Sequence, residues 1–201
     1  DNWYKQLFVS ILITLLLWIM AWIILRHYRY ILNQKIELER ISITDQLTKL
    51  YNRYKLNEVL QSEFNRASRI NYNFGVIIID IDNFKKINDV FGHNIGDKVL
   101  KELAKLLKEN IRVSDTLGRW GGEEFLIIIP QGEDRNEEIL AEKLRSKIEN
   151  HSFSKIPKLT ASFGISRYKK GDTISKIIKN ADDALYEAKR NGRNQVKMNN
   201  I

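Results

Sequence analysis

Two neighbouring acids, Glu123 and Glu124, follow a pair of glycines and precede an apolar run in the stretch RWGGEEFLII, residues 119–128. A second acidic pair, Asp80 and Asp82, ends another apolar run. Clustered carboxylates repel each other unless a positive charge compensates them, and a divalent cation with oxygen ligands does this most readily. Each motif alone is common at solvated turns and strand ends, so the prediction of a Mg²⁺ site, with Mn²⁺ as the alternative metal, depends on the two motifs lying together.

Three cations are candidates to compensate these acids. Lys85 follows the second acidic pair, Lys189 falls in the last turn of a predicted helix, and Arg193 follows Gly192. Lys189 and Arg193 either complement the dipole at the end of that helix or, together with Mg²⁺, neutralise a triphosphate. Their spacing alone does not decide between these readings.

The acids must be positioned by strands. Side chains alternate along a strand, so Asp80 and Asp82 are predicted to point to one side while Ile81 points to the core. The Gly121-Gly122 pair predicts a tight hairpin, and if this hairpin lies beside the first strand, Glu123 and Glu124 emerge near the same edge. The predicted strands are residues 74–81, 116–120, 123–129, 159–168 and 195–198.

Amphipathic stripes predict the helices that cover this sheet. Asp45 is predicted to cap a first helix containing Leu47 and Leu50, and Asp97 to cap a later one that follows a loop through Phe91 and Gly92. Further helices are predicted over residues 56–67, 137–150 and 174–188. The combination predicts an α/β (α+β) sandwich with a mixed central sheet of about five strands flanked by helices.

Residues 7–25 contain no charge and are long enough to span a bilayer as a helix. The alternatives are a buried core helix and a signal peptide. Arg26, Arg29 and Lys35 follow this segment, whereas only Lys5 precedes it, which predicts a single-pass anchor in the inner (cell) membrane with the C-terminal part in the cytoplasm. Since the chain begins with Asp1, we expect a fragment preceded by a sensor.

The next segment has a weak seam of apolar residues interrupted by Lys35. It predicts either a single helix or the dimeric stalk of a coiled coil. The seam residues are Ile24, Tyr28, Ile31, Leu38 and Ile41. The predicted division is therefore a transmembrane helix at 1–25, a helical stalk at 26–43 and a catalytic domain at 44–201.

The composition limits the classes of function. The 201 residues include no cysteine, which excludes a disulfide framework and a thiol nucleophile. The net charge of +8 favours anionic partners such as nucleotides, nucleic acid or lipid headgroups. Nucleic acid is the least favoured of these, because the excess charge is accounted for near the membrane and at the predicted triphosphate site.

Five motifs in order resemble the GGDEF-domain diguanylate cyclases and cover nearly all of residues 44–198. They are TDQLTKLYNR at 44–53, DIDNFKKINDVFGHNIGDKVL at 80–100, RWGGEEF at 119–125, ASFGIS at 161–166 and ADDALYEAKRNGRN at 181–194. The resemblance implies a palm-like nucleotide-cyclase fold and a nucleotidyltransferase that condenses two GTP into cyclic di-GMP as a homodimer. The sequence departs from the family's name-giving motif by Glu in place of Asp, which keeps the charge.

The resemblance also implies roles for individual residues. Asp80, Glu124 and the Ile81 carbonyl would bind Mg²⁺, with Glu123 as a further ligand or as the base for the attacking 3′-hydroxyl. The triphosphate and the guanine would be bound by other matching positions. These are the backbone of Asn83, Phe84 and Lys85 and the side chains of Lys189 and Arg193 for the phosphates, and Asn88 and Asp97 for guanine.

A further resemblance concerns Arg112 and Asp115, which form an RxxD motif nine residues before the glycine pair. At this position the family has an inhibitory site for the product, so inhibition by cyclic di-GMP is expected. The competing hypotheses are a silent receptor for cyclic di-GMP and a membrane scaffold that only dimerises. The complete set of acids and cations disfavours both.

Overall fold

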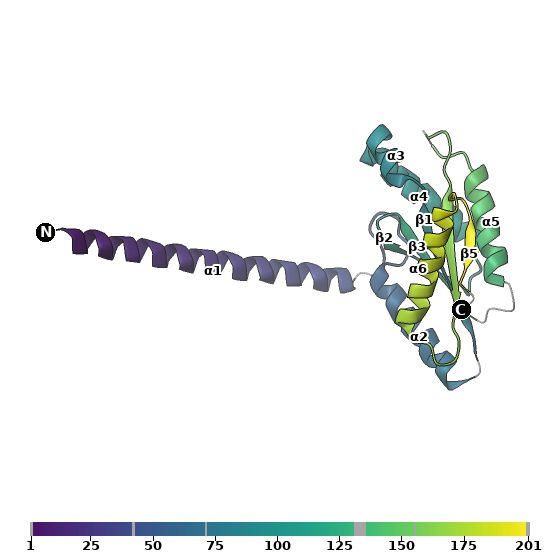
Figure 1. Cartoon of the computed structure of the whole chain (residues 1–201), viewed down its shortest axis with the longest axis horizontal. Helices are drawn as coiled ribbons and strands as arrows, with labels where there is room; N and C mark the ends of the chain where they lie inside the picture. Colours follow the sequence, from purple (N-terminus) through teal and green to yellow (C-terminus); the bar gives the residue numbers. More distant parts are fainter. Residues whose placement is uncertain (1, 42, 71, 131–135, 155, 200–201) are drawn as a thin grey trace. The chain divides into compact units, whose positions relative to one another are not determined.

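The computed structural model describes the chain apart from residues 1, 42, 71, 131–135, 155 and 200–201. The side chains of residues 33, 35–41 and 136 are also outside the description. The chain divides into two compact units, Asp1–Ser42 and Ile43–Ile201 (Figure 1). The two units are described separately below.

The first unit is one continuous helix, α1, at Trp3–Ile41. Within Trp3–Leu32, an 18-residue window has a mean hydropathy of 2.7 and none of it is buried, so the helix is long and apolar enough to cross a bilayer. A signal sequence also satisfies this test, and the membrane anchor therefore stays a prediction. The helix crosses the expected boundary at residue 25 without a break. The side chains of Lys35, Leu38 and Ile41, on which the stalk seam depends, lie outside the described residues.

The second unit is built on one five-stranded sheet with the order β2-β3-β1-β4-β5. All neighbouring strands run antiparallel except β4 and β5, which are parallel. This confirms the predicted mixed sheet. The strands are β1 at Phe74–Ile81, β2 at Thr116–Gly121, β3 at Glu124–Pro130, β4 at Ala161–Arg167 and β5 at Val196–Met198.

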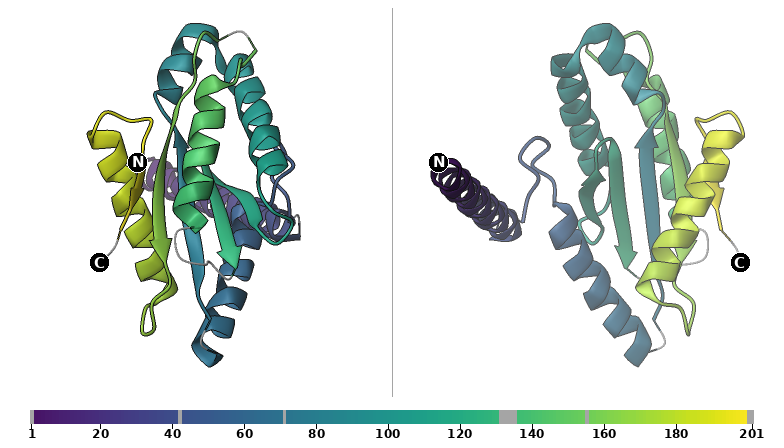
Figure 2. Two further views of the ribbon diagram at one scale, coloured as in Figure 1. Left: turned by 90° about the vertical axis from the view of Figure 1, so that its right-hand side faces the viewer. Right: turned by 60° about the vertical axis from the view of Figure 1, so that its left-hand side comes forward.

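Helices cover both faces of the sheet (Figure 2). The central strand β1 is buried along its whole length because its alternate residues enter two different cores. The helices are α2 at Arg53–Arg69, α3 at Phe84–Phe91, α4 at His93–Asn110, α5 at Asn136–Asn150 and α6 at Ile174–Arg190. Ile77 and Ile79 pack with α4 and α5, whereas Val76 and Ile78 pack with α2 and α6.

The helix α6 approaches the sheet very closely at one point. Gly164 of β4 faces α6, and a Cβ built on it would overlap the Ala181 carbonyl oxygen and the Leu185 backbone. The missing side chain therefore lets the helix lie against the strand. This contact fixes the distance between α6 and the sheet.

Two predicted caps are wrong. Asp45 begins a turn and not a helix: its Oδ1 accepts hydrogen bonds from the backbone N (2.8 Å) and Oγ1 (2.7 Å) of Thr48. Asp97 lies inside α4, whose N-cap is Gly92, and its side chain is exposed. The predicted loop through Phe91 is also wrong, since residues up to Phe91 form α3. Gly92, with φ of 81°, provides the sharp change of direction between the two helices.

Candidate active site

The site begins at the end of β1, where the apolar strand carries Asp80. Antiparallel pairing places Asp80 directly opposite Glu124 at the start of β3, so the two side chains share one face of the sheet. Asp80 is buried, and its pKa is raised to about 6 despite the lowering effect of Lys189. Burial is the main cause, and the charges of Glu123 and Glu124 contribute in the same direction. The structure thus brings the three predicted acids close enough to interact electrostatically.

Lys189, in the last turn of α6, contributes a positive charge to this group of acids. Its Nζ lies 2.8 Å from Asp80 Oδ2. The helix ends directly afterwards at the C-cap Asn191, and Gly192 follows with φ of 106°, a conformation that favours glycine. Lys189 is therefore engaged with an acid of the site and does more than complement the helix dipole.

Asp82 has a different environment from Asp80. Its Oδ2 accepts hydrogen bonds from Thr160 Oγ1 (2.7 Å) and the Asn194 backbone N (3.0 Å), and its Oδ1 accepts one from Ser162 Oγ (2.7 Å). The carboxylate joins β1, β4 and the loop after α6. Asp82 is therefore a structural acid in this arrangement.

The β2–β3 hairpin positions Glu123. The two-residue turn is Gly122-Glu123 and not the predicted Gly121-Gly122, because Gly121 still pairs with Glu124 after a bulge in β2. Arg119 fixes this turn: its Nε (3.0 Å) and Nη2 (2.7 Å) donate to the Gly122 carbonyl oxygen.

The third nitrogen of the Arg119 guanidinium, Nη1, lies 3.3 Å from Asp45 Oδ2. Burial raises the pKa of Asp45, but hydrogen bonds from Thr48 and the charge of Arg119 outweigh burial and lower the pKa. The turn at residue 45 and the acidic hairpin are therefore joined by one ion pair.

The predicted phosphate turn lies where β1 passes into α3. Asn83 has φ of 56° and ψ of 30°, and Phe84 and Lys85 form the first turn of the helix. Amides in a first helical turn have no carbonyl partner within the helix and can bind an anion. Asn83 and Lys85 are exposed at this point.

The two predicted guanine-binding residues come from adjacent helices, Asn88 from α3 and Asp97 from α4. Asn88 packs against Gly96, where a Cβ would overlap its Oδ1. Asp97 is the next residue of α4. Its carboxylate does not cap the helix and is exposed, so it is available to a ligand.

The donor set fits a hard divalent cation. Asp80 and Glu124 supply paired carboxylates. Burial raises the pKa of Asp80, and a bound positive ion would lower that pKa and so favour the charged carboxylate. Among the residues whose side chains the structure describes, no three acidic or histidine side chains converge as a metal-binding group in the present arrangement. Lys189 supplies positive charge to the acids in this arrangement.

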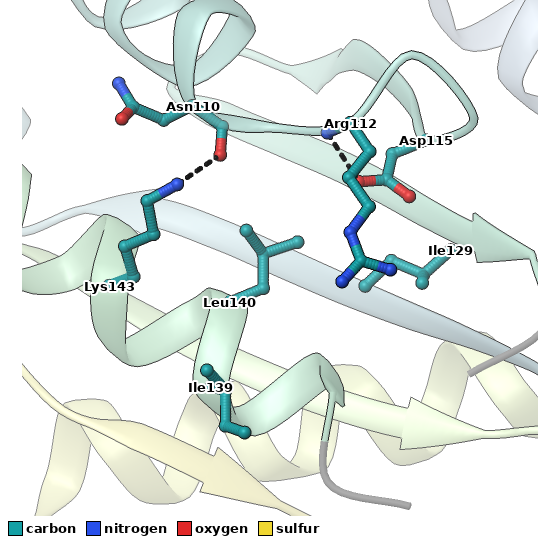
Figure 3. A pocket seen from close by; sticks show the side chains of 7 residues that line it. All are labelled: Asn110, Arg112, Asp115, Ile129, Ile139, Leu140 and Lys143. Carbon is teal, nitrogen blue, oxygen red and sulfur yellow. Dashed lines mark hydrogen bonds between the residues drawn. The ribbon is translucent and has the colours of Figure 1, made fainter. Parts of the chain in front are cut away.

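The RxxD residues lie at the other end of β2 from the acidic hairpin. Arg112 and Asp115 close a turn through two hydrogen bonds, from Arg112 N to Asp115 Oδ2 (2.9 Å) and from Asp115 N to the Arg112 carbonyl oxygen (3.1 Å). Beside this turn is a cavity of about 160 Å³, into which the Arg112 side chain extends (Figure 3). Its wall includes Leu140 and Lys143 of α5. The motif thus borders a space with cationic side chains on two sides.

Sequence reasoning missed several residues around the site. Arg119, Arg145 and Asn194 each link segments far apart in the chain. Arg119 and Asn194 lie inside recognised motifs, but nothing in their spacing names their partners. Lys143 and Arg145 stand at helical positions where a solvated charge is the ordinary expectation, so no signal distinguished them.

The fold belongs to the class formed by GGDEF domains. The GGDEF domain of DgcB from Caulobacter crescentus, solved in complex with c-di-GMP, has a TM-score of 0.76 and 29% sequence identity, over 80% of this chain and 97% of that domain. The active GGEEF domain of a diguanylate cyclase from Vibrio cholerae has a TM-score of 0.71 and 41% identity, over 75% of this chain and 97% of that domain.

Sequence comparison agrees with the fold. The family described as "Diguanylate cyclase, GGDEF domain" matches residues 42–195, and the chain belongs to this family. The response regulator PleD from Caulobacter vibrioides is 38% identical over 177 residues, which are 85% of this chain but 39% of PleD. The chain therefore spans well under half the length of this relative.

Proposed function

We propose that the chain is a diguanylate cyclase that converts two GTP into cyclic di-GMP and two pyrophosphates. In each half of the reaction a 3′-oxygen forms a bond to the α-phosphorus of the other GTP, and the bond from that phosphorus to pyrophosphate breaks. The observation that carries the proposal is the pairing of Asp80 with Glu124 across β1 and β3, with Lys189 at 2.8 Å from Asp80. Family membership supports the same reaction.

The acids would hold the metal. Asp80, Glu124 and the Ile81 carbonyl oxygen would bind Mg²⁺, with Mn²⁺ as the alternative, and Glu123 would be a further ligand or the base for the 3′-hydroxyl. When bound, a divalent cation stabilises the negative charge that develops on the phosphoryl oxygens. With an ion present, we expect Lys189 to leave Asp80 and to bind phosphate, because its four-carbon side chain is flexible.

The remaining residues would position the nucleotide. The amides of Asn83, Phe84 and Lys85 would bind the β- and γ-phosphates at the first turn of α3. Arg193 would join Lys189 on the triphosphate. Guanine would be recognised by Asn88 and Asp97, since a carboxylate accepts from the N1–H and amino group that adenine does not offer together.

The reaction requires two domains, because each would hold one GTP and the two nucleotides must meet face to face. A homodimer supplies this arrangement. The three-part division at residues 25 and 43 is part of the proposal: α1 would anchor the chain in the membrane, continue as a stalk and pair with a second copy. The catalytic domain would lie in the cytoplasm.

The proposal is tested with the full chain in detergent, incubated with GTP and Mg²⁺. We expect cyclic di-GMP and pyrophosphate from the native chain and none from Glu124→Ala. If neither yields product, fusion to a dimerising zipper separates the explanations. Product from the fused chain alone would indicate that dimerisation limits the isolated chain, whereas continued inactivity would contradict the cyclase and favour the silent receptor.

Product inhibition is the second part of the proposal, and the cavity of about 160 Å³ beside Arg112 favours it. A guanidinium extending into a cavity can bind a phosphate or a guanine edge. We expect Arg112→Ala to weaken inhibition by added cyclic di-GMP by about tenfold or more while the initial rate stays within about twofold. Unchanged inhibition would contradict the assignment of the site.

A further inference from the structure

The loop after α6 has an unfavourable backbone that needs support. Arg193 and Asn194 have φ of 63° and 48°, so two successive residues with side chains are in the left-handed region. Such residues are uncommon outside glycine and persist when the surroundings hold them. The side chain of Arg193 is exposed, so its direction depends mainly on this backbone.

Asn194 connects the loop to two other parts of the domain. Its backbone N donates to Asp82 Oδ2 at 3.0 Å, next to the acidic site. Its side-chain Oδ1 accepts a hydrogen bond from Arg145 Nη1 at 2.8 Å. The conformation at Asn194 is therefore fixed from α5 as well as from β1.

Arg145 is itself rigidly held. Its Nε and Nη2 donate to Glu142 (2.9 and 2.7 Å to Oε1), and its Nη1 donates to Glu149 Oε2 at 2.7 Å. Only 16% of its side chain is exposed. The fork of a guanidinium fixed by two carboxylates has little freedom left, so it can orient a third partner.

The helix that carries Arg145 is anchored at its first turn. Glu137 is fully buried and its Oε2 lies 2.6 Å from Arg167 Nη2 of β4. The neighbouring position on β1 is Gly75, where a Cβ would overlap Glu137. The first turn of α5 is thus tied to the sheet, and its last turns hold the Asn194 loop.

We propose that Arg145 is a positioning residue, which acts through Asn194 to hold Arg193 in place for the phosphates of GTP. Arg145 does not touch the acids of the site; its effect passes through the loop. The inference rests on the proposed function for the ligand of Arg193, but the positioning itself is a property of the free protein.

The first test measures the loop in the full chain in detergent, without nucleotide or metal. We expect Arg145→Gln to accelerate hydrogen exchange at the Asn194 amide by about tenfold or more, since the charged hydrogen bond that fixes the loop is lost. Lys147→Gln is the matched control, because Lys147 is an exposed cation on the same helix. Equal exchange in both variants would overturn the positioning role whatever the activity of the native chain.

The second test measures the consequence for GTP. We expect Arg145→Gln to raise KM about tenfold with a smaller change in kcat, Arg145→Lys to recover part of the loss, and Lys147→Gln to have no effect. If the native chain and its zipper fusion both bind GTP without forming product, the same ratio is measured as Kd in the presence of Mg²⁺. That result would refute the cyclase while still deciding the role of Arg145.

A double-mutant comparison separates positioning from general loss of structure. If Arg145 acts through Arg193, adding Arg145→Gln to Arg193→Gln should change KM by less than about twofold. Multiplied effects of the two substitutions would overturn the proposal, as would an unchanged KM in Arg145→Gln. A native chain that binds no GTP would overturn both this proposal and the cyclase.

Discussion

Asp80 and Asp82 lie two residues apart and are equally buried, each with 6% of its surface exposed, yet their surroundings differ. Asp82 receives three hydrogen bonds, from two hydroxyl groups and one backbone amide. Asp80 faces a flexible lysine and two further acids, and burial raises its pKa. A buried carboxylate with its acceptor sites filled stabilises the fold, whereas one placed among other acids is suited to bind a cation.

The same substitution at the two positions should therefore have different effects. Asp80→Asn should lower the rate of cyclic di-GMP formation by about a thousandfold or more, because it removes a charge that the metal requires. The domain should remain folded, and thermal unfolding should show a midpoint no lower than that of the native chain. A variant that keeps more than about a tenth of the native rate would contradict the metal-binding role of Asp80.

Asp82→Asn should act first on stability. The amide group places an N–H donor among three donors, and we expect a loss of about 2 to 3 kcal/mol in the free energy of unfolding. Chemical denaturation of the full chain in detergent measures this loss. Activity should fall less than in Asp80→Asn, through the Asn194 loop. A stability equal to the native value would mean that the hydrogen bonds to Asp82 contribute little.

The stability of the metal-free protein should depend on pH through the raised pKa of the Asp80 carboxyl. This carboxyl has a pKa of about 6 in the folded chain and an ordinary value of 3.8 when unfolded. The folded state therefore binds more protons between these values, and stability should fall as the pH rises from about 4 to about 6. We expect a loss of roughly 1 to 2 kcal/mol over this range, because the range ends close to the two pKa values and the full shift is not yet realised there.

Denaturation curves in EDTA between pH 4 and pH 7 measure this effect. The Asp80→Asn variant serves as the control, because it lacks the titrating group and should show a smaller decline over the same range. If the two proteins lose stability in parallel, Asp80 does not hold a raised pKa.

The smallest effect is expected for Ser162→Ala, which removes one neutral donor to Asp82. We expect a loss of about 1 kcal/mol in stability and a rate within about threefold of the native value. The same denaturation and product assays apply. A rate reduced as strongly as in Asp80→Asn would show that the environment of Asp82 takes part in the chemistry.

The sheet and most of its helices followed from the sequence, because buried strands and amphipathic stripes are local patterns. The span of β1, residues 74–81, was predicted to the residue. The caps at Asp45 and Asp97 were not: acids favour helix starts, but Asp45 is used by Arg119 and the helix near Asp97 already begins at His93. Residues 84–91 were overlooked as a helix because only Phe84 and Ile87 are buried in it.

The candidate site was predictable in its residue types and only partly in its geometry. Two acidic motifs and three cations gave a charge pattern, and the hairpin was expected near the end of β1. The exact register, with Asp80 opposite Glu124, comes from the pairing of β1 with β3. The roles within the acidic pair at 80 and 82 did not follow from spacing. They depend on Thr160, Ser162 and Asn194, which join the site from distant segments, and local patterns carry no information on such contacts.

Gly164 has no side chain that could take part in the reaction, yet it affects the geometry of this site. Because α6 rests on the bare backbone of β4 there, a single added methyl group would lift the helix and carry Lys189 away from Asp80. The distance between Lys189 and Asp80 therefore depends on the missing Cβ at Gly164. A search confined to charged or polar side chains would overlook position 164, although the site tolerates no side chain there.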